Sequence, residues 1–159
     1  MNHSRTETGV TLLELLAAMV ILFILIAVGV PSFNSFIKES RLRTTTNMLV
    51  MDINYARSEA VKRGSRVVLC RSANPTSATP TCGGTAEIWT TGWIIFVDNN
   101  SNLTYDPGIN PTDDAILKKT EVQPTGYTII SNADADSALA FNSEGSKIGT
   151  VEAKFAICD

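Results

Sequence analysis

Glu14 is the residue whose surroundings in the sequence demand the clearest chemical explanation. It stands among apolar residues, directly before sixteen uncharged residues from Leu15 to Val30. A carboxylate inside such a run costs roughly 2.5 kcal/mol or more in lipid unless a partner neutralises it. Glu14 therefore requires a partner that neutralises its charge.

A second group of polar residues has the spacing of a cation-binding loop, with side-chain oxygens at alternate positions. The set consists of Asp98, Asn100, Asn102 and Asp106. It departs from the EF-hand pattern at Leu103, where a glycine belongs, and at Ile109, where a bidentate glutamate belongs. The favoured interpretation is a metal-free loop closed by its own Asn and Asp side chains, and calcium binding is the alternative.

Three cysteines, Cys70, Cys82 and Cys158, leave one thiol over after any single pairing. Cys70 and Cys82 bracket a short polar loop, so a disulfide between them is the simplest prediction. Pairing of Cys158 with either of the other two remains open at this stage. A zinc site is not expected, because no two cysteines lie close together and the single histidine is near the N-terminus.

Catalysis is not expected from this chain. The usual base partner for a serine or aspartate nucleophile is missing, since the single histidine stands at position 3. We therefore predict that the protein is not an enzyme. The aromatic residues Trp89, Trp93 and Phe96 are predicted to pack in the core rather than to bind a ligand.

A long N-terminal helix must position Glu14. The residues from Val10 to Val30 number 21, which is about 30 Å of helix and enough to cross a bilayer. Pro31 is expected to kink this helix, because proline removes a backbone hydrogen bond. We expect the helix to continue to Arg63 and to end at Gly64.

The second half of the helix is predicted to be amphipathic, with one apolar face at helical spacing. This face consists of Leu42, Leu49, Ile53, Ala56 and Ala60. The polar residues expected to lie away from it are Arg41, Thr45, Asp52, Glu59 and Lys62.

After Gly64 the pattern changes to short apolar runs that predict antiparallel strands. The expected strands are 66–70, 87–89, 92–97, 115–122 and 127–130, and a terminal hairpin or meander is expected from 139–141, a turn over 142–145 and the segment 147–158. The predicted fold class is α+β, with a long N-terminal helix packed on an antiparallel β-sheet head. Three parts are expected: a leader over 1–9, a membrane and assembly segment over 10–30, and a head over 31–159.

Charge is unevenly distributed along the chain. Residues 38–66 contain seven Lys or Arg and three acids, whereas residues 67–159 contain five Lys or Arg and eleven acids. The head is therefore acidic beyond the helix and has no nucleic-acid-binding footprint.

The N-terminal segment resembles a type IV prepilin leader, in which a small residue precedes the apolar run instead of following it. The resemblance rests on Gly9, Glu14 and Pro31, and it departs at Val10, where the family most often has Phe. It implies that a prepilin peptidase cuts between Gly9 and Val10 and that the new Val10 amine is N-methylated. It also implies that Glu14 pairs with this amine on a neighbouring subunit, with an intrachain pair as the alternative.

Two further segments, 55–64 and 92–98, are similar to the GspH/FimT family of minor pilins and pseudopilins. The resemblance implies a structural subunit of a type IV pilus or a type II secretion pseudopilus, which contacts other pilins through its helix. It implies insertion in the inner membrane by a single pass, with a head in the periplasm, where disulfides persist. The alternative is a competence pilin that binds DNA. The acidic head argues against this alternative. Such relatives have a glycine- and arginine-rich tail after the last cysteine, and this sequence stops one residue after Cys158, so either the tail is absent or the sequence is a fragment.

Overall fold

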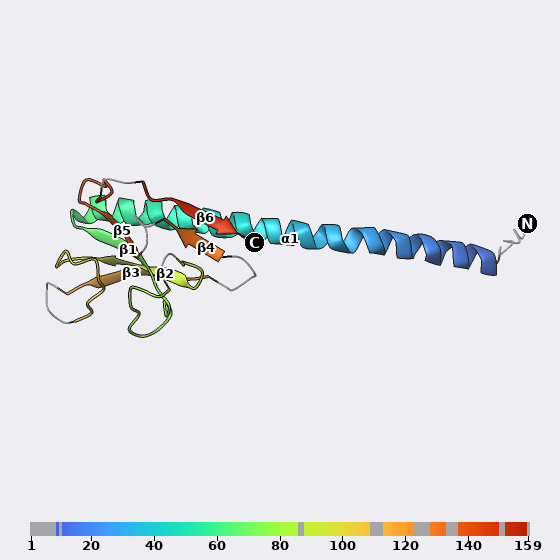
Figure 1. Ribbon diagram of the computed structural model, residues 1–159, viewed down its shortest axis with the longest axis horizontal. Coiled ribbons are helices and arrows are strands. Elements are labelled where there is room, and N and C mark those ends of the chain that lie inside the picture. Colours follow the sequence, from blue (N-terminus) through green and yellow to red (C-terminus); the bar gives the residue numbers. More distant parts are fainter. Residues whose placement is uncertain are drawn as a thin grey trace, which may run out of the picture. The chain divides into compact units, whose positions relative to one another are not determined.

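The structure is a computed structural model that describes residues 9, 11–85, 88–108, 113–122, 128–132, 137–149 and 152–158, without the side chains of 30–32. Residues 1–40 and 41–159 form two units, and each is described by itself. The helix α1, Leu12–Arg63, belongs to both. This helix and the strands confirm the predicted α+β class, with the part of α1 after residue 40 lying beside the strands (Figure 1).

Both ends of α1 have an identifiable local cause. Thr11 precedes the helix, and its hydroxyl oxygen accepts a hydrogen bond from the backbone N–H of Glu14 over 3.2 Å, as an N-cap residue does. Gly64 follows Arg63 with a φ of +61°, a conformation that glycine adopts without strain. The predicted end is confirmed. The predicted start at Val10 lies outside the described residues, and Thr11 is not yet helical.

The described strands form two antiparallel sheets. The larger has the order β3-β2-β1-β5, and the smaller pairs β4 with β6. Their bounds are β1 Val67–Arg71, β2 Gly92–Val97, β3 Ala115–Glu121, β4 Thr128–Ser131, β5 Ala138–Phe141 and β6 Phe155–Cys158. The predicted β2 is confirmed in full, β3 and β5 differ from prediction by one residue at one end, and β1 is shifted by one residue at both ends.

The larger sheet has hydrophobic residues on both faces because α1 covers one face and loops cover the other. The face toward α1 contributes Val67, Leu69, Trp93 and Ile95 to the main core, which also contains Trp89. Phe96 belongs to a separate cluster with Val68, Cys70 and Ile94. All three predicted core aromatics are thus fully buried.

One strand prediction was wrong, and the predicted terminal hairpin is formed only in part. The segment 87–89 is not a strand in its described part, since Ile88 makes only an isolated bridge to Ile130. The hairpin begins as expected, because Phe141 bridges Lys147 and the backbone N–H of Ile148 donates to the carbonyl of Ala140 over 2.8 Å. Strand β6 does not continue that hairpin. It pairs with β4 instead, with Ile157 opposite Ile129, because this register places both side chains in the core. The predicted start of β4 at Tyr127 lies outside the described residues.

The polar residues of the amphipathic half-helix were also partly misassigned. Thr45, Asp52 and Glu59 are buried, although the sequence suggested that they lie away from the apolar face. Asp52 is only 1% exposed, since it lies between Leu49 and Ala56 on the side of α1 that meets the sheet. Its burial depends on the polar partners that the strands supply.

Candidate functional site

The N-terminal end of α1 presents Glu14 in the first helical turn. Its side chain is exposed, and no described residue pairs with its carboxylate. The first turn of a helix favours a negative charge, because unpaired backbone N–H groups point toward its N-terminus. The described structure therefore leaves Glu14 available to a cation from outside the helix.

The helix after Glu14 has an uncovered apolar surface. Large hydrophobic side chains between positions 12 and 28 are about half or more exposed, among them Leu13, Phe23, Leu25 and Val28. Within the described residues, α1 alone is long and apolar enough to cross a membrane, and its most apolar window is not buried inside the protein. Such a surface requires lipid or other helices around it.

Pro31 lies within the described helix, which is α-helical from Leu12 to Arg63 without a break. The side chain of Pro31 is not among those that the structure describes, so the kink stays a prediction.

Gly9, the residue before the predicted cut, is exposed, and a Cβ added there would meet no atom within 4 Å. Val10 lies outside the described residues, and cleavage and N-methylation at this position stay predictions.

The head-facing side of α1 is fixed by a hydrogen-bond network around Asp52. The indole of Trp93 donates to Asp52 Oδ2 over 2.8 Å, and the hydroxyl of Thr120 donates to the same oxygen over 2.7 Å. Lys118 pairs with the other oxygen, Oδ1. These three partners come from β2 and β3, so one buried carboxylate links the helix to two strands. The carboxylate is satisfied as buried charges require.

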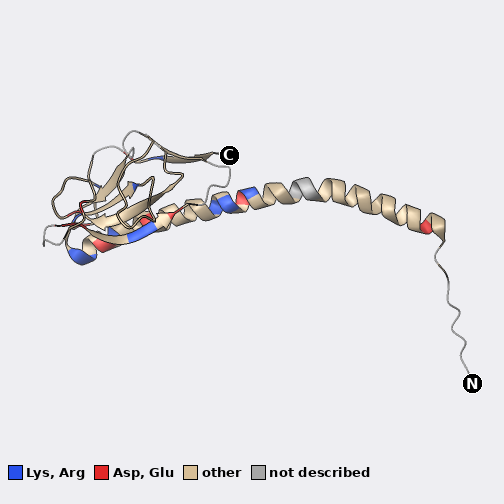
Figure 2. Ribbon diagram, turned by 90° about the horizontal axis from the view of Figure 1, so that it is seen from below, with Lys and Arg blue, Asp and Glu red and all other residues tan. Residues whose placement is uncertain are grey.

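The last turn of α1 contains a smaller ionic cluster. Glu59 accepts from Arg63 over 2.6 Å and from Lys62 over 3.3 Å. The hydrogen bond from Arg63 lowers the pKa of Glu59, and Lys62 adds to this effect against partial desolvation. Figure 2 shows the charged residues of α1 in blue and red. Basic residues near a helix C-terminus also interact favourably with its dipole.

The predicted calcium loop is closed by its own hydrogen bonds. Asp98 accepts from the backbone N–H groups of Asn102 and Leu103 over 3.1 and 3.2 Å. Asp106 accepts from the side-chain amides of Asn100 and Asn102 over 3.0 and 2.6 Å. The described residues contain no group of three or more His, Cys, Asp or Glu placed to hold a metal. Calcium binding by this set stays a prediction.

Asp114, which sequence reasoning did not single out, organises the same loop. Its carboxylate accepts from the backbone N–H groups of Asn99 and Asp106 over 2.9 and 3.0 Å. Burial raises its pKa, and the nearby carboxylates of Asp98 and Asp106 act in the same direction. The pKa of Asp106 is lowered, mainly by the amide of Asn102. The pKa values of Asp114 and Asp106 are therefore shifted in opposite directions from their ordinary values.

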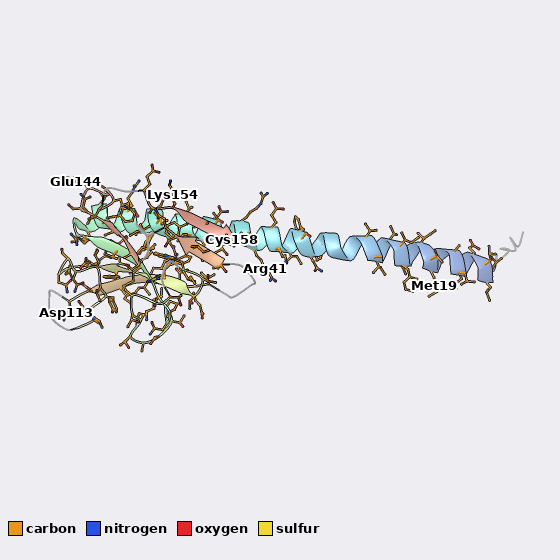
Figure 3. All side chains as sticks on the ribbon, viewed as in Figure 1. Met19, Arg41, Asp113, Glu144, Lys154 and Cys158 are labelled. Carbon is orange, nitrogen blue, oxygen red and sulfur yellow. A yellow bond between two sulfur atoms is a disulfide. The ribbon has the colours of Figure 1, made fainter. Side chains whose placement is uncertain are left out.

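The disulfide joins Cys70 in the central strand β1 to Cys82, as the sequence suggested, with a sequence separation of 12. Cys158 is free and exposed at the end of β6, where Figure 3 labels it. The pairings of Cys158 that the sequence left open are therefore not formed.

Asp52 and Asp114 are the residues that sequence reasoning missed. The sequence did contain a signal for the burial of Asp52, because this residue lies three residues after Leu49 and four before Ala56, at the helical spacing of the apolar face.

Comparison with known proteins identifies the family of this chain. A family model described as "Type II transport protein GspH" matches residues 45–159, which is most of the chain. The chain belongs to the GspH family. The match begins within the amphipathic half of α1 and includes every strand of the head.

This GspH-family chain is also similar to the pilin-like protein PilA1 of Thermus thermophilus. The two are 30% identical over 106 residues, which cover 65% of this chain and 56% of the relative. The chain thus aligns with little more than half the length of that protein. No solved structure matches the chain.

Proposed function

We propose that this GspH-family chain is a minor pilin or pseudopilin, a structural subunit of a type IV pilus or a type II secretion pseudopilus. The observation that carries the proposal is the uncovered apolar surface of α1, attached to a head of the GspH family. The similarity to a pilin-like protein supports the same role. In this role, α1 anchors the chain in the inner membrane and packs against the helices of neighbouring subunits.

We further propose that a prepilin peptidase cuts between Gly9 and Val10 and that the Val10 amine is then methylated. The exposure of Gly9 supports access to the bond. Cleavage places a new cation four residues before Glu14, on the same apolar segment. Because the carboxylate has no partner among the described residues, the amine of a neighbouring subunit can pair with it and set the axial register of the subunits.

Two measurements test this role in cells that contain the cognate machinery. Intact-mass spectrometry of the membrane-extracted protein is expected to show a chain that begins at N-methyl-Val10. Gly9→Leu is expected to leave the chain uncut, because the larger side chain crowds the peptidase site. An uncut wild-type chain in the presence of active peptidase would refute the processing proposal.

Glu14→Ala tests assembly separately from insertion. The variant is expected to keep or raise its level in the inner membrane, since it removes a costly charge from the span. Its incorporation into sheared filaments is expected to fall, because the amine of the neighbour loses its partner. Glu39→Ala is the matched control, because this acid lies on α1 beyond the apolar run. Equal incorporation of Glu14→Ala and wild type would show that register does not depend on this pair.

A further inference from the structure

Strand β6 has one edge paired with β4 and a second edge that faces away from it. Ile129 of β4 accepts a hydrogen bond from Trp89 N–H over 2.9 Å and donates to Thr90 Oγ1 over 3.0 Å, so its backbone groups point away from β6. Ile157 lies opposite Ile129. Because directly opposed residues of an antiparallel pair direct their backbone groups alike, the N–H and C=O of Ile157 point outward from the sheet.

The same alternation applies to Phe155, which lies two residues before Ile157. No described residue makes a hydrogen bond to the backbone N–H or C=O of Phe155 or Ile157. The side chains of both residues pack against the main core, so the strand is held in place. A strand edge of this kind, fixed in position and with donors and acceptors that no described residue pairs, is a template for another strand.

Phe155, the first residue of β6, also lines an apolar groove of about 320 Å³. It lies among α1, β5 and the start of β6, and Ile53, Leu139, Phe141 and Phe155 form its apolar walls. The volume is within the range of binding pockets and large enough for one or two side chains. Figure 3 labels Lys154, which directly precedes β6, and Cys158, the last residue of this strand.

Arg57 gives the groove a positively charged rim. Its guanidinium carbon lies 5.6 Å from the centre of the Phe141 ring, so a cation–π contact holds the group at the groove. No described carboxylate forms an ion pair with Arg57. Lys147 and Glu152 also line the groove and carry opposite charges, so Arg57 gives the lining its net positive charge. The rim therefore favours a negatively charged ligand.

We propose that the open edge of β6 and the adjoining groove bind an extended acidic segment of a partner polypeptide by strand addition. The backbone of the segment pairs with Phe155 and Ile157, an apolar side chain enters the groove, and a carboxylate two residues away meets Arg57. Alternate side chains of a strand share one face, so one segment satisfies both requirements. This surface is separate from the apolar part of α1, and the proposal does not depend on processing or filament assembly.

The test uses full-length protein in neutral detergent micelles and a fluorescent, end-blocked hexapeptide. The peptide alternates threonine with glutamate, valine and glutamate, which places the acids and the valine on one face. Anisotropy titration is expected to show saturable binding. A peptide with lysine in place of both glutamates is expected to bind at least about tenfold more weakly, since each lost charged hydrogen bond has about this effect.

Backbone pairing is tested on the peptide, so that the protein fold stays intact. One peptide carries N-methyl groups on the amides of the threonines, and a second carries them on the other amides. Only one of these sets faces β6 in a strand, because N–H groups alternate between the two edges. One peptide is therefore expected to lose binding and the other to keep it. Equal binding by both would overturn strand addition.

Arg57→Glu tests the charged rim, and Lys154→Glu is the matched control, with the same charge change on an exposed residue outside the groove. Arg57→Glu is expected to weaken binding of the acidic peptide at least about tenfold, with little change for the control. Equal weakening by both variants would indicate unspecific attraction and overturn the site. Absence of peptide binding together with Arg57-dependent dimerisation of the protein would assign the edge to a second copy instead.

Discussion

The indole N–H of Trp93 donates to Asp52 Oδ2 inside the core, and this 2.8 Å hydrogen bond fixes the rotation of α1 against strand β2. A hydrophobic face alone would permit small rotations and shifts of the helix along the sheet. A buried carboxylate does not permit such rotations and shifts, because a displaced helix would leave the carboxylate unpaired. The position of α1 on its head is therefore set by one polar residue surrounded by apolar contacts.

Asp52→Ala is expected to lower the free energy of unfolding by about 3 kcal/mol, since it leaves the donors of Trp93 and Thr120 buried without an acceptor. Asp52→Asn keeps one oxygen as acceptor and is expected to cost about half as much. Denaturant unfolding of the full-length protein in detergent, followed by tryptophan fluorescence, measures both. A loss below about 1 kcal/mol for Asp52→Ala would show that the network does not stabilise the docked helix.

Removal of the disulfide is expected to destabilise the head. Cys70→Ala combined with Cys82→Ala opens a loop with a sequence separation of 12, for which chain entropy predicts a loss of about 3 kcal/mol. Cys158→Ala is the control and is expected to leave unfolding unchanged, because this thiol is free and exposed. The same denaturant unfolding compares the three proteins. Non-reducing peptide mapping that found Cys158 bonded to another cysteine would contradict the assignment.

The pH dependence of the 98–114 loop is expected to have two opposite contributions. Burial raises the pKa of Asp114 above its ordinary value of 3.8, so its contribution is full below pH 3.8 and is lost as pH rises through the folded pKa. Hydrogen bonds from Asn102 and Asn100 lower the pKa of Asp106 below 3.8. Its contribution is therefore full above pH 3.8 and is lost as pH falls through the folded pKa.

Carbon-detected NMR of the side-chain carboxyl groups is expected to show Asp114 titrating at a higher pH than Asp106. Asp114→Asn is expected to gain stability relative to wild type as pH rises through the window above 3.8, whereas Asp106→Asn is expected to lose stability relative to wild type as pH rises through the window below 3.8. The reverse order of titration would contradict the described arrangement of the loop.

Duplex DNA is expected to bind this chain weakly or not at all near physiological salt. Beyond position 66 the chain has eleven acids and five basic residues, so the field of the head repels phosphate. Any binding at low salt is expected to fall steeply as salt rises. Anisotropy titration at two salt concentrations measures this. Micromolar binding that survives about 150 mM salt would favour the competence role, and Lys147→Ala and Lys154→Ala would then locate the contact.

The helix, the disulfide and most strands were predictable because their causes are local. Gly64 ends a periodic apolar pattern, and Gly92 begins a run of apolar residues that forms β2. The pairing of β6 with β4 was not predictable from local pattern. It depends on placing Phe155 and Ile157 in a core made by residues far away in the sequence.

Asp52 was misassigned for a related reason. A carboxylate on a helix is usually solvated, and only the strands reveal the donors that make its burial favourable. Its position between Leu49 and Ala56 was a visible conflict with that assumption. The predicted roles of Gly9, Val10 and Glu14 depend on proteins outside this chain, so no fold of one subunit can establish them.

The network around Asp52 also has a consequence for the timing of folding during synthesis. Its partners Trp93, Lys118 and Thr120 follow it by 41, 66 and 68 residues. At a synthesis rate of about 5–20 residues per second, the side of α1 that will face the sheet waits roughly 3 to 14 seconds for Thr120. If the head crosses the membrane as it is made, this side of the helix is open to chaperones and to other nascent helices throughout that interval.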